Sequence, residues 1–113
     1  MDDCLFCKIY GGEIPSEILY KDNYCFAIKD INPVSPVHLL IIPSVHLTHL
    51  QSFEVEDFRI LNSMYEVAVE LAIAKGISES GYRLVINQKR DSGQQFPHLH
   101  LHLIGGHKLA GIG

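Results

Sequence analysis

The alternation of hydrophobic and polar positions is most regular between Phe96 and Gly106, where the chain is FPHLHLHLIGG. Strict alternation has the period of a β-strand, whose successive side chains point to opposite faces. It predicts a strand with His98, His100 and His102 on one face and the intervening leucines on the other. We expect the leucines to face a core and the histidines to face a cleft, a metal or solvent. A half-exposed strand whose polar face happens to be histidine is the alternative.

Other short apolar stretches predict further strands and a short helical turn. Residues 4–11 are typical of a helical turn ended by glycine, and the polar residues 88–97 predict a loop before the histidine strand. The remaining strands are expected in 17–30, a hairpin that turns at Lys21–Asn23, in 37–43, which Pro43 ends, and in 82–87.

The longest helical pattern lies between Ser52, a candidate N-cap, and Gly76, a candidate C-cap. Its apolar arc covers roughly 200°, wider than the ~100° stripe of an ordinary surface helix. One stripe can cover a sheet, and the other needs a second partner, either another subunit or loops. The first stripe is Phe58, Leu61, Tyr65, Ala68 and Ala72, and the second is Ile60, Met64, Val67, Leu71 and Ala74.

About five strands, one long helix and short connections predict an α+β fold built on an antiparallel sheet, rather than repeated βαβ units. With 113 residues, 1–113 is expected to be a single domain. The composition is 47% hydrophobic and 19% charged, which is typical of a globular chain.

The charge and the cysteine content limit the binding partners and the cellular compartment that we expect. The net charge is −4 and no basic run exists, which argues against a nucleic-acid partner, although a compact phosphate site remains possible. No signal peptide or membrane span is evident, so we expect a cytoplasmic protein without a membrane partner. The three cysteines are expected to be thiols or metal ligands, not disulfides, and Cys25 is expected in the core.

A single metal is not expected to bind all three histidines. Residues i and i+4 of a strand lie about 13 Å apart, whereas zinc takes its histidine nitrogens at about 2.0–2.1 Å. The triad is therefore predicted to divide its work between a metal and catalysis. Cys4 and Cys7 share a face of the N-terminal turn, but a lone C-x-x-C leaves zinc, redox chemistry and neither function open.

The segment HLHLHLI resembles the histidine-triad motif, His-φ-His-φ-His-φ-φ with φ apolar. The segments CLFCKIYGGEIPSEILYKDN, IKDINPVSPVHLLIIPSVHL, GYRLVIN and SGQQFPHLHLHLIGG are similar to the family's segments, in the family's order. The chain looks most similar to the nucleoside phosphoramidase branch. This resemblance implies the histidine-triad fold, a homodimer formed through the helix and a strand, and hydrolysis at the α-phosphorus of purine nucleoside 5′-phosphoramidates or related nucleotidyl esters.

The resemblance also implies the roles of individual residues. His100 would be the nucleophile that forms a covalent nucleotidyl-histidine, which water then cleaves. Neutral imidazole is a good nucleophile near pH 7. His102 would contact the phosphate, with His38 as a partner behind them, and Asp30 would accept from the ribose hydroxyls. The base would contact Phe6, Ile14, Ile28, Ile31 and Leu40, and the phosphate would contact Asn87, Gly93, Gln94 and Gln95.

Two departures from the branch concern specificity. Gln95 stands where the branch often has a hydroxyl residue, and Pro97 stands where it often has an aromatic one. The resemblance to metal-bearing bacterial members, and to galactose-1-phosphate uridylyltransferases, implies a structural zinc that catalysis does not require. This zinc would be held in a closed tetrahedral site by Cys4, Cys7, His46 and His98.

Three alternatives differ in function class. A dinucleoside polyphosphate hydrolase of the fragile-histidine-triad type tends to carry glutamine between the second and third histidines, where Leu101 stands. A hydrolase with a catalytic zinc on the triad is disfavoured by the strand spacing. A nucleotide-binding scaffold with residual turnover would have the same site residues.

Overall fold

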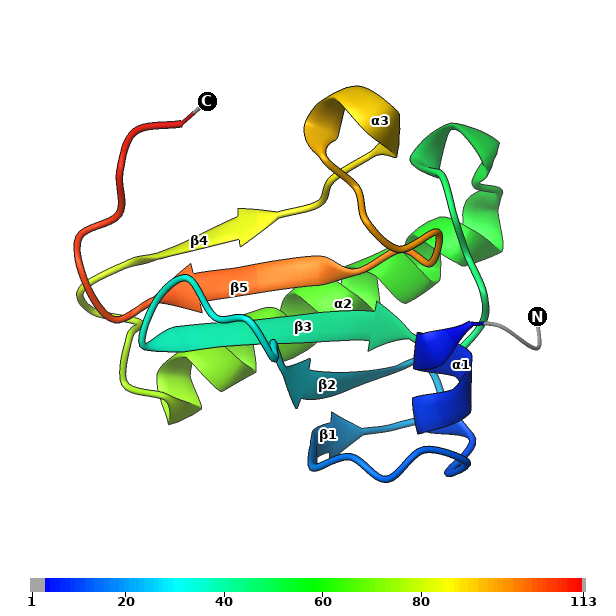
Figure 1. Ribbon diagram of the computed structural model, residues 1–113, viewed down its shortest axis with the longest axis horizontal. Helices are drawn as coiled ribbons and strands as arrows, with labels where there is room; N and C mark the ends of the chain where they lie inside the picture. The colour runs from blue at the N-terminus through cyan, green and yellow to red at the C-terminus, as the bar shows by residue number, and fades with distance from the viewer. Residues whose placement is uncertain (1–3, 113) are drawn as a thin grey trace.

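The structure is a computed structural model, described for residues 4–112, so residues 1–3 and 113 of the predicted domain lie outside the described part. A five-stranded antiparallel sheet has the order β1-β2-β3-β5-β4, which confirms the predicted α+β architecture (Figure 1). The elements are α1 (Leu5–Tyr10), β1 (Ile18–Lys21), β2 (Cys25–Lys29), β3 (Val37–Pro43), a 3₁₀ turn (Leu50–Ser52), α2 (Val55–Ala74), β4 (Tyr82–Val85), α3 (Lys89–Ser92) and β5 (Leu101–Gly105).

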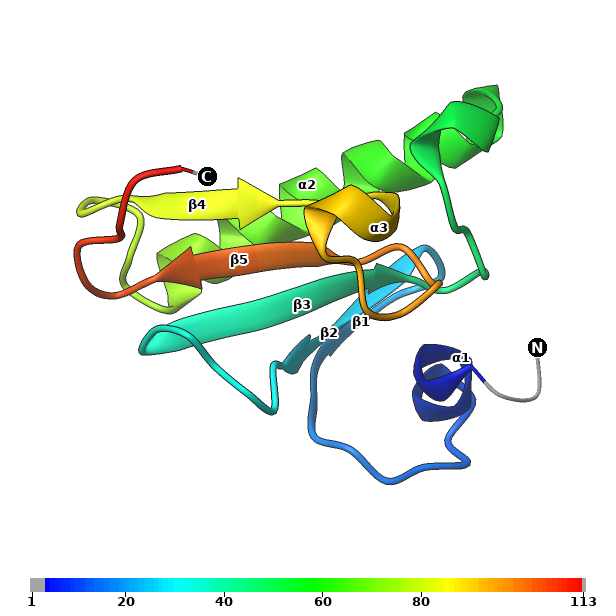
Figure 2. The ribbon, with the colours of Figure 1, turned by 45° about the horizontal axis from the view of Figure 1, so that its top comes forward.

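The long helix α2 and the short helix α1 lie on opposite faces of the sheet (Figure 2). Alternate residues of β3 divide between the two faces, as the period of a strand requires. Leu39 and Ile41 belong to the core under α2, whereas Leu40 and Ile42 pack with Phe6 of α1. His38, which has the same parity as Leu40, therefore projects to the α1 face.

The histidine strand is shorter than predicted. β5 begins at Leu101, so His98 and His100 precede it. Pro97 has no N–H to donate, and the chain here instead pairs irregularly with a loop, where Leu99 N–H donates to the carbonyl of Leu47 at 2.7 Å. The predicted alternation of burial nevertheless persists, since the three triad leucines are all completely buried.

The start of α2 also differs from the prediction. Ser52 lies in the 3₁₀ turn, and the N-cap is Glu54. The Glu54 side chain and Asp57 form a reciprocal capping box, which satisfies two otherwise free N–H groups. At the other end the C-cap is Lys75, and Gly76 follows it with a φ of 75°, a conformation that favours glycine.

The division of α2 into two stripes was wrong. Its buried residues are Met64, Val67, Ala68 and Ala72, which come from both predicted stripes and form one face over the sheet. A line of apolar side chains remains exposed on the helix, namely Phe58 (50%), Tyr65 (39%), Val69 (43%) and Ile73 (57%).

The remaining predictions concern the other strands, Cys25 and the loop before the triad. The hairpin of residues 17–30 and the strand of residues 37–43 are confirmed, and Cys25 is fully buried as expected. β4 ends at Val85 rather than Asn87, and the predicted polar loop contains α3. Among the described residues, none of the helices combines the length and the hydrophobicity that crossing a membrane requires.

Candidate active site

A cavity of about 350 Å³ opens on the α1 face of the sheet and contains the clustered histidines. Its lining includes His38 from β3, His102 from β5 and His100 just before β5. Two predicted contacts, Ile14 and Gln94, do not line it. Those that do are Phe6, Ile28, Asp30, Ile31, Leu40, Asn87, Gly93 and Gln95.

Several lining residues were not predicted from the sequence. Leu5 and Ile9 flank Phe6 at helical spacing on α1, and that spacing was a signal that could have found them. Nothing in the sequence singled out the others, which are Ser16, Lys29, Asn32, Val34 and Phe96.

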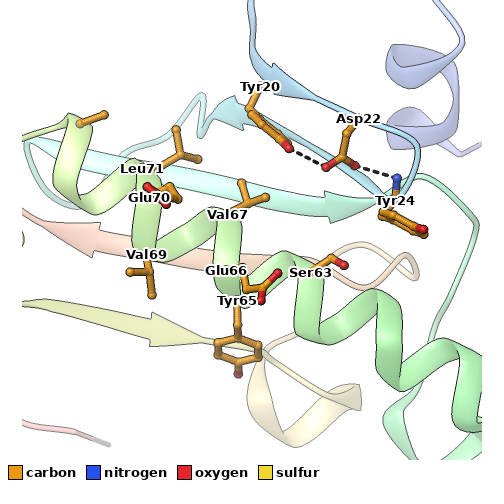
Figure 3. A pocket seen from close by; sticks show the side chains of 11 residues that line it. Tyr20, Asp22, Tyr24, Ser63, Tyr65, Glu66, Val67, Val69, Glu70 and Leu71 are labelled. Atoms are coloured by element: carbon orange, nitrogen blue, oxygen red, sulfur yellow. Dashed lines mark hydrogen bonds between the residues drawn. The ribbon is translucent and has the colours of Figure 1, made fainter.

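A larger, more open groove of about 850 Å³ lies on the other face, between α2 and the β1–β2 hairpin (Figure 3). It contains neither histidine nor cysteine. It is lined by three carboxylates, Asp22, Glu66 and Glu70. Asp22 is already engaged, because Tyr20 donates its hydroxyl at 2.6 Å and Tyr24 donates its N–H at 2.7 Å. The clustered histidines lie in the smaller cavity, which is therefore the candidate active site.

His38 and His102 meet because β3 and β5 are neighbours. Leu40 pairs with His102 in the antiparallel register, which places His38 diagonally across from His102 on the same face. Nε2 of His38 lies 2.9 Å from Nδ1 of His102 and 3.3 Å from Oδ2 of Asp30. The other oxygen of Asp30 accepts the N–H of Asn32 at 2.8 Å, which fixes the carboxylate at the cavity edge.

The His102 ring is held in its neutral form. Burial lowers its pKa from 6.5 to about 4, and His100 and His38 act in the same direction while Asp30 opposes them. Nε2 of His102 is buried without a hydrogen-bond partner, in a side chain that lines the cavity. A polar atom of this kind is available to a ligand.

His100 is oriented by its own chain. Its Nδ1 lies 2.8 Å from the carbonyl oxygen of His98, and a carbonyl can only accept, so Nδ1 carries the hydrogen. In the neutral ring this leaves the lone pair on Nε2, the nitrogen that would attack an electrophile. The rings of Phe6 and Phe96 flank the imidazole, with centroids at 5.4 and 6.3 Å.

The loop beside His100 is braced by Gln94. Its side-chain oxygen accepts the N–H of Lys89 at 2.7 Å, and its amide donates to the carbonyl of Phe96 at 3.0 Å. Lys89 has a φ of 65°, which is uncommon for a residue with a side chain, and the Gln94 contact helps to hold it. Gln94 therefore shapes the loop, and its neighbour Gln95 lines the cavity.

The two N-terminal cysteines converge with His46 and the first triad histidine. One ligand atom from each of Cys4, Cys7, His46 and His98 lies within 4.8 Å of all the others. Nδ1 of His98 is 3.1 Å from the Cys4 sulfur and 3.6 Å from the Cys7 sulfur, and Nδ1 of His46 is 3.4 Å from the Cys7 sulfur.

The proton position on His98 suits a metal in this cluster. Its Nε2 donates to the carbonyl of Pro43 at 3.0 Å, so in the neutral ring Nδ1 has a free lone pair directed at the two sulfurs. Burial lowers the pKa of His98 to about 4, which favours this neutral form. Two thiols and two imidazoles are a donor set that suits zinc.

The HIT domain family model matches residues 11–109. Over 108 residues the chain is 41% identical to the purine nucleoside phosphoramidase of Escherichia coli K12, an alignment that spans 96% of this chain and 91% of that protein.

Solved structures give the same relationship. A HIT family hydrolase from Clostridium thermocellum superposes with a TM-score of 0.94 at 42% identity, covering 99% of this chain and 97% of that one. A HIT family hydrolase from Legionella pneumophila gives a TM-score of 0.91 at 44% identity and covers 96% of each chain.

Proposed function

We propose that this chain, which belongs to the HIT domain family, hydrolyses purine nucleoside 5′-phosphoramidates or related nucleotidyl esters at the α-phosphorus. Its relatives include proteins named as HIT family hydrolases and as a purine nucleoside phosphoramidase, which supports a hydrolase acting on a nucleotide. The phosphoramidate bond and the purine base are the finer parts of the proposal.

The contact between His100 Nδ1 and the His98 carbonyl carries this proposal. It leaves Nε2 of His100 with a lone pair inside the cavity. That lone pair would attack the α-phosphorus, the P–N bond would break, and the amine would leave with the bonding electrons and take up a proton from solvent water. Water would then attack the nucleotidyl-histidine, releasing the nucleoside monophosphate and regenerating the imidazole.

The other cavity residues would bind and orient the substrate. The unpartnered Nε2 of His102 would contact a phosphoryl oxygen, supported by His38 behind it. Asp30, as a fixed carboxylate, would accept from the ribose hydroxyls. The apolar side chains of Phe6, Ile28, Ile31 and Leu40 would face the base, and Asn87, Gly93 and Gln95 would lie along the phosphate.

A structural zinc on Cys4, Cys7, His46 and His98 is the second part of the proposal. When bound, the ion would tie α1 to the segment before β5 as a closed four-ligand centre. None of its ligands is His100 or His102, so the chemistry would not pass through it. The reduced thiols that zinc needs are typical of the cytoplasm, which is where we place the protein.

A homodimer would cover the apolar line on α2. Tyr65, Val69 and Ile73 are spaced at i, i+4 and i+8 and remain exposed in the single chain. β4 is an edge strand of the sheet, and edge strands are usually covered or paired. A second copy packed along α2 and β4 would cover both.

The test is incubation with adenosine 5′-phosphoramidate, measuring AMP release by the native protein and by His100→Ala. We expect the variant to lose roughly 10³-fold or more of the turnover, as removal of a nucleophile does in other enzymes, while it still binds AMP. His107→Ala, which removes an exposed histidine outside the cavity, is the control and should keep full activity. Near-native turnover by His100→Ala would refute the assignment.

A further inference from the structure

The loop between β2 and β3 contacts Nδ1 of His38 through a backbone N–H. The N–H of Val34 donates to Nδ1 of His38 at 3.1 Å. A peptide N–H can only donate, so Nδ1 of His38 must accept and cannot carry a hydrogen. The single hydrogen of the neutral ring is therefore on Nε2.

This hydrogen faces two acceptors. Nδ1 of His102 is at 2.9 Å and Oδ2 of Asp30 is at 3.3 Å, so the hydrogen bond to His102 is the shorter. Nδ1 of His102 then accepts, and in the neutral ring its hydrogen is on Nε2. That is the nitrogen which is buried without a partner in the cavity lining.

We propose that the backbone N–H of Val34 sets the tautomers of both His38 and His102, so that His102 presents an N–H donor to the phosphoryl group. Val34 is thus a positioning residue that acts through two imidazoles in series. The identity of the recipient as a phosphoryl group rests on the proposed function, but the tautomers themselves do not.

The direction of the hydrogen bonds from Val34 through His38 to His102 matters for the chemistry. With the opposite tautomers, Nε2 of His102 would present a lone pair to an anionic phosphate, and the contact would be repulsive. This series of hydrogen bonds begins at the peptide N–H of Val34, which keeps its hydrogen. Val34 therefore supplies no proton to His38, and its part in the arrangement is to fix the donor that His102 presents to developing negative charge.

The same hydrogen positions distinguish this cluster from the cysteine site. Ligand atoms of Asp30, His38 and His102 also lie within 4.8 Å of one another. A metal at that point would need a lone pair on Nε2 of His38, which the Val34 contact assigns to a hydrogen. We therefore expect no metal at this second cluster.

The direct test is a long-range ¹H–¹⁵N correlation spectrum of the ¹⁵N-labelled native protein at neutral pH without nucleotide, which reports the hydrogen position on each imidazole. We expect Nε2 to be protonated and Nδ1 to be unprotonated in both His38 and His102. The opposite tautomer in either ring overturns the proposal. Because no substrate is present, the result is independent of whether the protein hydrolyses phosphoramidates.

A pair of variants tests the role of Val34. Val34→Pro removes the N–H, and Val34→Ala keeps it while shortening the same side chain. We expect Val34→Ala to retain both tautomers, and Val34→Pro to give a mixture at His38 with a kcat at least about fivefold below that of Val34→Ala, the scale of one hydrogen bond. A folded Val34→Pro protein with native tautomers refutes the proposal. If Val34→Pro does not fold, the native spectrum decides.

Discussion

The carbonyl oxygen of His98 lies 2.8 Å from Nδ1 of His100, so one residue serves two centres. Its ring is directed at the two cysteine sulfurs, while its backbone sets the proton position of the candidate nucleophile. Phe6 adds a second connection, because it lies between Cys4 and Cys7 in the chain and packs against the rings of both His98 and His100. The cysteine site is thus positioned to stabilise the geometry around the candidate nucleophile.

This arrangement predicts the effect of zinc. Protein purified without chelators or a polyhistidine tag should contain about one zinc per chain, as a full set of four ligands implies. Removing it should lower the melting temperature and increase hydrogen exchange in residues 4–9, because metal binding contributes to folding stability. Hydrolysis should decrease but not vanish. Metal analysis by mass spectrometry measures the content, and Cys7→Ser, which removes one ligand, should reproduce the effect of stripping. A zinc content below a tenth of an equivalent per chain, with no zinc uptake on titration, would refute the site.

Asp30 is predicted to recognise the ribose. Asp30→Asn should raise KM for a ribonucleotide substrate by roughly 10-fold, on the scale of one hydrogen bond to a charged group. The same change should have a much smaller effect on a 2′,3′-dideoxy substrate, which lacks both hydroxyls. Because Asp30 also lies 3.3 Å from Nε2 of His38, the comparison of the two substrates isolates the ribose contact from any effect on that ring. Equal losses on both substrates would contradict the assignment.

The buried His102 predicts how stability depends on pH. Its pKa is lowered from 6.5 to about 4 in the folded protein, so between these values the unfolded chain binds more protons than the folded one. Its contribution to the free energy of unfolding is therefore complete above about pH 6.5 and is lost as the pH falls toward 4. The free energy of unfolding, measured by urea denaturation, should differ less between pH 7.5 and pH 5 for His102→Asn than for the native protein. An unchanged difference would contradict the prediction.

The exposed line on α2 predicts a homodimer. Light scattering at micromolar concentration should give about twice the chain mass of 12.7 kDa. Val69→Arg should give a monomer, because Val69 is 43% exposed in the single chain and the charge would be buried only on association. Val45→Arg places the same charge on a valine that is 47% exposed outside α2, and it should remain dimeric. A native protein of monomer mass would refute the interface.

The sequence determined the features that depend on local periodicity. The alternation around the triad predicted that its leucines would be buried, and they are, even where the backbone is not a regular strand. The apolar run of residues 37–43 and the pattern of the long helix predicted β3 and α2 for the same reason. Side-chain period is a property of neighbouring residues, so it can be recognised without knowing the fold.

Features with competing local signals were predicted less well. Ser52 and Glu54 both precede the helix, and the reciprocal contact of Glu54 with Asp57 decided where α2 begins. Ile14 and Gln94 were expected to line the cavity because of their residue types and their places in the segments that resemble the family's. Ile14 instead packs against the core under α1, and Gln94 makes hydrogen bonds within its own loop.

Only the tertiary structure decided which ring nitrogen of His98 and of His102 donates, whereas that of His100 is set by a carbonyl two residues away. The proton position on His98 is set by the carbonyl of Pro43, which is 55 residues away. The proton position on His102 is set by His38, which is 64 residues away and itself accepts the N–H of Val34. An imidazole has the same two nitrogens at every position in the sequence. Which of them donates depends on partner atoms that the fold brings within hydrogen-bond distance, and no local pattern encodes those atoms.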